Sequence, residues 1–168
     1  ESWPRPIPQW NGDMNRLAAV ASLALLSALA GCGMGTRLQP PTASVQQLQA
    51  QADGTWLVTL RIENYSYDTG MHVYAVDADF DLGGKSAGHL SVSPDLDIPE
   101  MSADTATATL TPGADARAAL AAAKGNAVAY ALKGSLSVGK GEGGKPARFE
   151  LDGKGYLSPV PGLANMWR

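Results

Sequence analysis

Three sets of side chains in this sequence have types and positions that could support chemistry. One is the thiol of Cys32, the single cysteine of the chain. Another is a row of carboxylates at alternate positions: Asp77, Asp79 and Asp81. The third is the pair of imidazoles of His72 and His89, which titrate near neutral pH. What each set can do depends on the element that carries it.

Cys32 follows a segment with the layout of a signal peptide. After Met14 the chain has a charged region, an apolar run from Leu17 to Leu29, and small residues up to Gly31. The apolar run is shorter than the roughly 20 residues that a transmembrane helix needs. We therefore expect residues 14–31 to be a signal peptide that is cleaved between Gly31 and Cys32.

The cleavage site also has a recognisable motif. Leu29-Ala30-Gly31-Cys32 resembles the lipobox of bacterial lipoproteins at all four positions. The resemblance implies a diacylglyceryl group on the Cys32 thiol and an acyl chain such as palmitate on the new amino terminus. At about 0.8 kcal/mol per buried methylene, several acyl chains anchor a protein to a membrane effectively permanently. The other interpretation of Cys32 is a buried free cysteine that packs as a small apolar residue.

The residues on either side of the signal peptide carry two further expectations. Gly33 stands where the resemblance would place aspartate in a lipoprotein of the inner membrane, so we expect the outer membrane, facing the periplasm. Residues 32–43 contain Pro40-Pro41 and no periodicity, which indicates a tether between lipid and domain. Residues 1–13 lack signal-peptide character, and we expect them to be an unstructured, over-extended start.

Composition indicates one small domain after the tether. The chain has 168 residues, of which 45% are hydrophobic, and this suits a packed core. The formal net charge of −3, with no basic stripe, argues against a nucleic-acid partner. One cysteine cannot form an intrachain disulfide, so packing must hold the domain together. We expect a monomeric domain over residues 44–157, followed by a tail over residues 158–168.

Alternation of apolar and polar residues predicts strands along most of this domain. In residues 55–64 the inward positions are Trp56, Val58, Leu60 and Ile62. In residues 72–82 the inward positions are Tyr74, Val76, Ala78, Phe80 and Leu82. In residues 127–138 they are Val128, Tyr130, Leu132, Leu136 and Val138. Gly83-Gly84 predicts a hairpin turn, and further strands are expected at residues 85–93, 105–110 and 147–157.

One helix is expected to begin at Pro112 and to continue through residues 114–123, where the sequence is rich in alanine. Thr111 would cap it, Pro112 would occupy its first position, and Gly125 would end it. Leu120 is its only large apolar side chain, so the helix should pack lightly. The expected fold class is all-β: an antiparallel sandwich of about seven strands, similar to fibronectin type III, with one short helix.

The order of these motifs resembles the group 2 late embryogenesis abundant (LEA) proteins, whose domain is also called the water-stress and hypersensitive-response (WHy) domain. The resemblance covers residues 41–157. It is carried by Arg61-Ile62-Glu63-Asn64-Tyr65-Ser66, Val73-Tyr74-Ala75-Val76, Gly84-Lys85-Ser86-Ala87-Gly88 and Ile98-Pro99-Glu100. Tyr65 departs from the family, which usually has proline after the asparagine. The resemblance implies a sandwich fold and a stress-linked protective or binding role, and it implies no catalytic residues.

The aspartate row and the histidines are expected to be structural. Phe80 and Leu82 need burial, so the aspartates between them should form a solvated strand face, with a weak cation site as the alternative. An EF-hand is not matched, because Leu82 and Gly88 stand where its glycine and glutamate belong. Each histidine is expected to be a surface or hairpin residue. No Gly-x-Ser-x-Gly motif is present, so we expect neither an enzyme nor any cofactor besides the lipid on Cys32.

The C-terminal tail carries three large apolar side chains: Leu163, Met166 and Trp167. They either dock back on the sandwich or contact a partner, and we favour docking. The expected function is therefore a lipid-anchored binding or protective role in desiccation or envelope stress. The alternative is an accessory subunit of an envelope or secretion assembly that docks through this tail.

Overall fold

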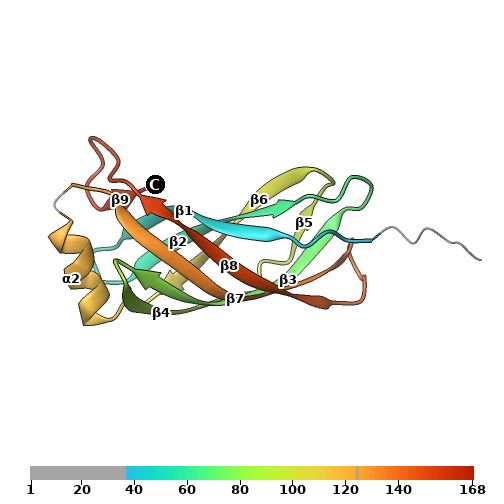
Figure 1. Cartoon of the computed structure of the whole chain (residues 1–168), viewed down its shortest axis with the longest axis horizontal. Coiled ribbons are helices and arrows are strands. Elements are labelled where there is room, and N and C mark those ends of the chain that lie inside the picture. The colour runs from blue at the N-terminus through green and yellow to red at the C-terminus, as the bar shows by residue number, and fades with distance from the viewer. Residues whose placement is uncertain (1–36, 124) are drawn as a thin grey trace, which may run out of the picture. The chain divides into compact units, whose positions relative to one another are not determined.

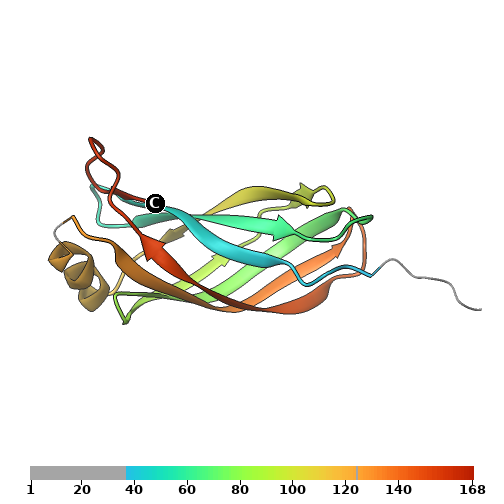
Figure 2. The same ribbon diagram turned by 45° about the horizontal axis from the view of Figure 1, so that its top comes forward.

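The computed structural model describes residues 37–123 and 125–168, which form two antiparallel β-sheets facing each other (Figure 1). The first sheet has the order β6-β2-β1-β9 and consists of β1 (Thr42–Ala50), β2 (Trp56–Asn64), β6 (Ser102–Leu110) and β9 (Met166–Trp167). The second has the order β4-β3-β7-β8, with β5 also paired to β3. Its strands are β3 (Met71–Leu82), β4 (Lys85–Val92), β5 (Leu96–Ile98), β7 (Val128–Lys140) and β8 (Ala147–Leu157). The predicted all-β sandwich is confirmed, and Figure 2 shows the sheets as two layers.

The core forms between the sheets from the predicted inward positions. On β2, Trp56 is 2% exposed and Val58, Leu60 and Ile62 are fully buried. The inward residues of β7 are buried in the same way, and side chains from both sheets join in one apolar cluster. Successive side chains of a strand point to opposite faces, so alternation in the sequence becomes one dry face and one wet face.

The alternation of β3 changes parity at a bulge. The register of β3 against β7 shifts between Val73 and Ala75. Met71 and Val73 are buried before the shift, and Val76 and the alternate residues that follow it are buried after it. Tyr74 lies at the shift and is only half-buried, so its predicted inward position is wrong; its hydroxyl donates to the carbonyl of Gly144 at 2.7 Å. A bulge adds one residue to one strand and thereby turns the following side chains to the other face.

Nine strands are present in the described residues, where about seven were expected. The strands that had no sequence prediction are β1, β5 and β9. β1 begins at Thr42, two residues before the expected domain start, and its register against β2 shifts between Val45 and Gln47. This shift breaks the apolar alternation along β1, which explains why no strand was predicted there.

Helix α2 (Ala114–Ala122) lies where a helix was predicted, but it begins differently. Its N-cap is Gly113, and no side chain caps it, so the expected roles of Thr111 and Pro112 are wrong. The amide of Gly113 donates to the carbonyl of Ala87 at 3.0 Å, which ties the helix start to β4. Gly125 has a φ of 89°, the left-handed conformation that commonly ends a helix, as predicted.

The sandwich has two distinct ends. At the helix end lie α2, the β1–β2 and β3–β4 turns and the C-terminus of the chain (Figure 1). At the other end, the loop end, lie residues 37–41 and the β2–β3, β5–β6 and β7–β8 connections (Figure 1). Between the ends, Tyr130 joins the sheets: its hydroxyl oxygen accepts a hydrogen bond from the Val45 amide at 3.1 Å.

Candidate functional site

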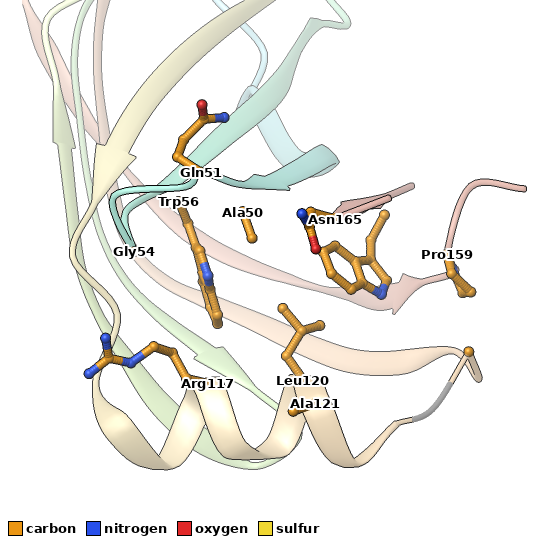
Figure 3. Close-up of a pocket in the computed structure, with 11 residues that line it drawn as sticks. Ala50, Gln51, Gly54, Trp56, Arg117, Leu120, Ala121, Pro159 and Asn165 are labelled. Carbon is orange, nitrogen blue, oxygen red and sulfur yellow. The ribbon is translucent and has the colours of Figure 1, made fainter. Parts of the chain in front are cut away.

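A cavity of about 430 Å³ opens at the helix end. Three segments that are far apart in the sequence form its walls: the β1–β2 turn, helix α2 and the C-terminal segment (Figure 3). The lining residues are Ala50, Gln51, Gly54, Trp56, Arg117, Leu120, Ala121, Gly125, Pro159, Asn165 and Trp167. Pockets of this size and largely apolar lining are typical of small-ligand sites.

Aromatic and aliphatic side chains give the cavity its apolar surface. Trp56 extends from β2 towards α2, where Leu120 lies beside the cavity (Figure 3). Both side chains are buried, at 2% and 7% exposure. Trp167 adds a second indole from β9. Trp56 was predicted as a core residue and is one, but it also presents part of its ring to the cavity.

The C-terminal segment reaches the cavity because it folds back as a hairpin. Ser158 and Arg168 exchange backbone hydrogen bonds, and Val160 donates to the carbonyl of Met166 at 2.9 Å. Met166 and Trp167 then pair with β1 as strand β9. The prediction that the tail docks on the sandwich is confirmed. Leu163 lies in the loop that connects the two arms of the hairpin and is 53% exposed.

The polar groups of the cavity are few. The carbonyl of Asn165, a residue with a φ of 62°, accepts a hydrogen bond from the Ala50 amide at 2.9 Å. The guanidinium of Arg117 lies near the β1–β2 turn, where a Cβ atom on Gly54 would be 3.8 Å from Nη1. Among the described residues, no hydrogen-bond or ion-pair partner is found for this guanidinium. In the part of its lining that the structure describes, the cavity therefore combines an apolar wall with one cation at its rim.

The β1–β2 turn holds its shape through local hydrogen bonds. The Thr55 amide donates to the carboxylate of Asp53 at 2.9 Å, and the Thr55 hydroxyl donates to the same oxygen at 2.7 Å. These bonds, the hydroxyl first, hold the pKa of Asp53 below its usual value. The two hydrogen bonds hold the turn next to Gly54, which lines the cavity.

None of the three aspartates of the row lines this cavity, and the row lies on the outer face of β3. Asp79 faces His89 Nδ1 at 2.9 Å, and Asp77 accepts from the Ser91 hydroxyl at 2.8 Å. The hydrogen bond to Asp79 raises the pKa of His89 despite partial desolvation, and Asp77 adds a smaller effect. Within residues 37–123 and 125–168, no group of three or more metal-ligating side chains is arranged to hold an ion.

His72 contradicts the expectation of a surface or hairpin residue. Its side chain is buried, and both ring nitrogens face carboxylates: Nδ1 is 2.8 Å from Asp97 and Nε2 is 3.0 Å from Asp95. The hydrogen bond to Asp97 raises the pKa of His72 above its ordinary value, and this effect exceeds that of desolvation. The pairing arises because β5 lies against the start of β3, and β5 had no sequence prediction.

The expected lipidation site lies outside the described residues, as do Gly31 and the expected signal peptide. In the part of the chain that the structure describes, no helix is long and apolar enough to cross a membrane.

Comparison with known proteins identifies related folds. No protein-family model matches the chain, and no curated protein matches it. The solved structure of AT1g01470 from Arabidopsis thaliana is similar, with a TM-score of 0.55 and 13% identity over 80% of this chain and 91% of that one. This likeness shows a common fold.

Two further solved structures resemble the chain more weakly. One is a protein from Archaeoglobus fulgidus, with a TM-score of 0.41 and 10% identity over 74% of this chain and 98% of that one. The other is named a "putative late embryogenesis abundant (LEA) protein", with a TM-score of 0.42 and 12% identity over 87% of this chain and 86% of that one.

Proposed function

We propose that this protein is a lipid-anchored, non-catalytic binding protein of the cell envelope that acts in desiccation or envelope stress. The anchor is proposed from the lipobox-like sequence that ends at Cys32. The stress role is proposed from the resemblance of the sequence motifs to group 2 LEA proteins. The binding role is proposed from the cavity at the helix end, which is the observation that carries the proposal.

The chemistry of the cavity supports binding more than catalysis. Its lining residues, as far as the structure describes them, include no carboxylate, imidazole or thiol. Both histidines are instead engaged with aspartates elsewhere on the second sheet. A catalytic site needs a nucleophile or a general base within reach of the reacting atoms. Two indoles, aliphatic groups and a guanidinium suit an apolar ligand that carries an anionic group.

The ligand class can be tested with soluble probes. Naphthalene-1-sulfonate has an apolar body and an anion, and 1-naphthylmethylammonium is its cationic counterpart. Calorimetry should detect binding of the sulfonate and weaker binding of the ammonium ion. Arg117→Gln should weaken sulfonate binding about tenfold, as the loss of one charge-assisted hydrogen bond predicts. Equal binding of both probes would contradict the assigned charge preference.

The anchor can be tested by mass spectrometry of the mature protein. We expect an amino-terminal Cys32 that carries diacylglyceryl and acyl groups, and flotation of the protein with membranes. Cys32→Ser should accumulate as the uncleaved precursor. Normal maturation and flotation of this variant would reject the proposed anchor.

The stress role can be tested with a matched pair of substitutions on α2. Ala121 lines the cavity and is exposed, whereas Ala122 is exposed and does not line it. Ala121→Trp should fill the cavity and fail to restore survival after drying in a strain that lacks the gene. Ala122→Trp, with the same added bulk, should restore it. Equal rescue by both variants would show that the cavity has no part in protection.

A second candidate is an accessory subunit of an envelope or secretion assembly, favoured by the exposed side chain of Leu163 on the C-terminal hairpin. Deleting the tail would also remove β9 from the first sheet, so a point substitution is the sharper test. If this function holds, Leu163→Ser should abolish one stoichiometric crosslinked partner, and Tyr156→Ser, an equally mild change at a more exposed side chain, should not.

A further inference from the structure

The loop end exposes three large apolar side chains close together. Tyr67 is 80% exposed, Met101 is 55% exposed and Tyr65 is 46% exposed. Tyr65 and Met101 line the same surface depression. The Met101 amide donates to the carbonyl of Ser66 at 3.1 Å, which fixes the β5–β6 loop against the β2–β3 loop between the two tyrosines. We call Tyr65, Tyr67 and Met101 the loop-end patch.

The segment that leads towards Cys32 leaves the domain beside this patch. The Gln39 amide donates to the Ser66 hydroxyl at 3.0 Å, and Leu38 is only 8% exposed. Leu38 lies six positions after Cys32, so the two Cα atoms can lie at most about 22 Å apart. A lipid on Cys32 therefore holds the loop-end patch near the membrane surface, whatever path the intervening chain takes.

The exposure of the patch is imposed by a rigid framework. Asn64, 1% exposed, donates to the carbonyl oxygens of Thr69 at 2.9 Å, Pro99 at 3.1 Å and Ile98 at 3.2 Å. Its Oδ1 accepts from the Ser66 amide at 2.9 Å. These bonds tie both loops of the patch to one buried side chain. The backbone that carries the two tyrosines is therefore fixed, and their exposure to solvent does not result from loosely held loops.

The backbone conformation of Met101 is a second observation that indicates a function for the patch. Its φ of 49° lies in the left-handed region, where glycine and asparagine are favoured and a long side chain is disfavoured. The position nevertheless carries a flexible apolar side chain that is mostly in solvent. Residues held in such backbone conformations cluster at functional sites.

We propose that the loop-end patch inserts into the headgroup region of the membrane to which Cys32 is anchored, so that the domain stands with its helix-end cavity away from the lipid. The inference rests on the proposed lipidation of Cys32. Tyrosine suits this depth, because its ring is apolar and its hydroxyl is polar. β3 has 12 residues and runs between the two ends, which places the cavity about 40 Å from the patch.

The lipid partner of the patch need not be anionic. The charged residues around it are mixed in sign: Arg37, Arg61, Glu63, Asp68 and Glu100. The Tyr65 hydroxyl donates to the carboxylate of Glu63, and the Arg61 guanidinium binds the same carboxylate at 2.9 Å. Contact with the membrane should therefore depend on apolar burial, and it should occur on phosphatidylcholine vesicles and persist in high salt.

The test uses the full lipidated protein in phosphatidylcholine vesicles whose acyl chains are brominated near the carbonyl groups. The tryptophans that follow Cys32, Trp56 and Trp167, both line the helix-end cavity and should remain unquenched. Tyr67→Trp should add fluorescence that bromine reduces about twofold or more, as expected of a ring at headgroup depth. Tyr156→Trp is the matched control, since Tyr156 is 74% exposed on β8 near the helix end. Its added fluorescence should not change.

Flotation of the same samples separates the two proposals. If the wild-type protein does not float with the vesicles, the anchor and the patch are both rejected. If it floats and Tyr67→Trp is quenched no more than Tyr156→Trp, the anchor stands and the patch is rejected. A crosslink from position 67 to an envelope protein, without quenching, would also reject a lipid contact.

A lengthened tether tests whether the patch has its own affinity for lipid. Twenty Gly/Ser residues inserted after Gly35 would add a flexible spacer with a root-mean-square length of about 25 Å. Quenching of Tyr67→Trp should persist in this variant and fall at least twofold when Tyr65→Ser and Met101→Ser are added. If lengthening the tether alone abolishes the quenching, the short tether and not the patch keeps the loops at the membrane surface. This result would overturn the proposal.

Discussion

The two ends of the sandwich are built on different principles. At the loop end, a buried asparagine binds two loops through four hydrogen bonds and holds the chain where it enters the domain. At the helix end, α2 buries only Ala116 and Leu120, and a cavity remains between the helix and the rest of the sandwich. Regions with few buried contacts open more readily than regions with dense hydrogen bonding. The loop end is therefore suited to orienting the domain and the helix end to admitting a ligand.

The largest effect should come from breaking the loop end at Asn64. Asn64→Ala leaves the Ser66 amide and several buried carbonyls without their side-chain partner, and unsatisfied groups of this kind cost about 1–3 kcal/mol each. We expect a loss of about 3 kcal/mol in the free energy of unfolding, measured by urea titration. Asn126→Ala is the control at the helix end: its Nδ2 donates to the Ala123 carbonyl from an exposed position. That variant should lose less than about 0.5 kcal/mol, and similar losses in both variants would refute the contrast.

A smaller loss should follow from weakening the helix end at Leu120. Leu120→Ala removes the largest side chain that attaches α2 to the core, and we expect a loss of about 2 kcal/mol, at the low end for a buried leucine because the site borders a cavity. Hydrogen exchange should show faster exchange in α2, with unchanged protection at Ser66 and Met101. Equal acceleration at both ends would mean that α2 is not a separately stable unit.

The strands that packing dictates could be predicted from the sequence, and those that depend on bulges or distant partners could not. The large apolar residues of β2 and β7 keep one parity along each strand, and both strands were predicted nearly to the residue. β1 carries a bulge after Val45, and β9 is a strand only because it pairs with β1. Short edge strands have little pattern of their own, since their partner supplies their hydrogen bonds. The helix was located correctly by its alanines, but its start was not, because Gly113 is held by the carbonyl of Ala87.

The candidate site was less predictable than the fold. Trp56, Leu120 and Trp167 were each noted in the sequence, as core, helix and tail residues. They line one cavity together because the C-terminal segment folds back as a hairpin, and no local sequence pattern predicted that hairpin. The burial of His72 depends in the same way on Asp95 and Asp97, more than twenty residues along the chain. Sites assembled from separate segments become visible only when the topology is known.

Titration should distinguish the buried histidine of the loop end from the exposed one nearer the helix end. Carboxylates raise the pKa of both His72 and His89 above the ordinary 6.5. Protonation therefore stabilises the folded state: this stabilisation is complete below pH 6.5 and is lost as pH rises through the raised pKa values. The free energy of unfolding should fall over this range in wild type and fall less in His72→Gln.

Salt provides the control for this titration. The His89 side chain is 56% exposed, so its interaction with Asp79 should be screened at high ionic strength. The His72 side chain is 5% exposed, so its contribution should persist there. A pH dependence that disappears entirely in high salt, or that is unchanged in His72→Gln, would contradict the assignment to the buried pair.

The smallest effect should come from exchanging residue types at the left-handed positions of the two ends. The helix end has asparagine there, Asn165 with a φ of 62°, whereas the loop end has Met101 with a φ of 49°. Asparagine tolerates this conformation better than methionine does. Met101→Asn should therefore raise the free energy of unfolding by about 0.5 kcal/mol, and Asn165→Met should lower it by at least as much, both read from thermal and urea transitions. If the loop-end patch contacts lipid, Met101→Asn should also weaken that contact while it stabilises the fold. If Met101→Asn is more stable and contacts the vesicles as well as wild type does, the strained conformation of Met101 does not serve lipid contact.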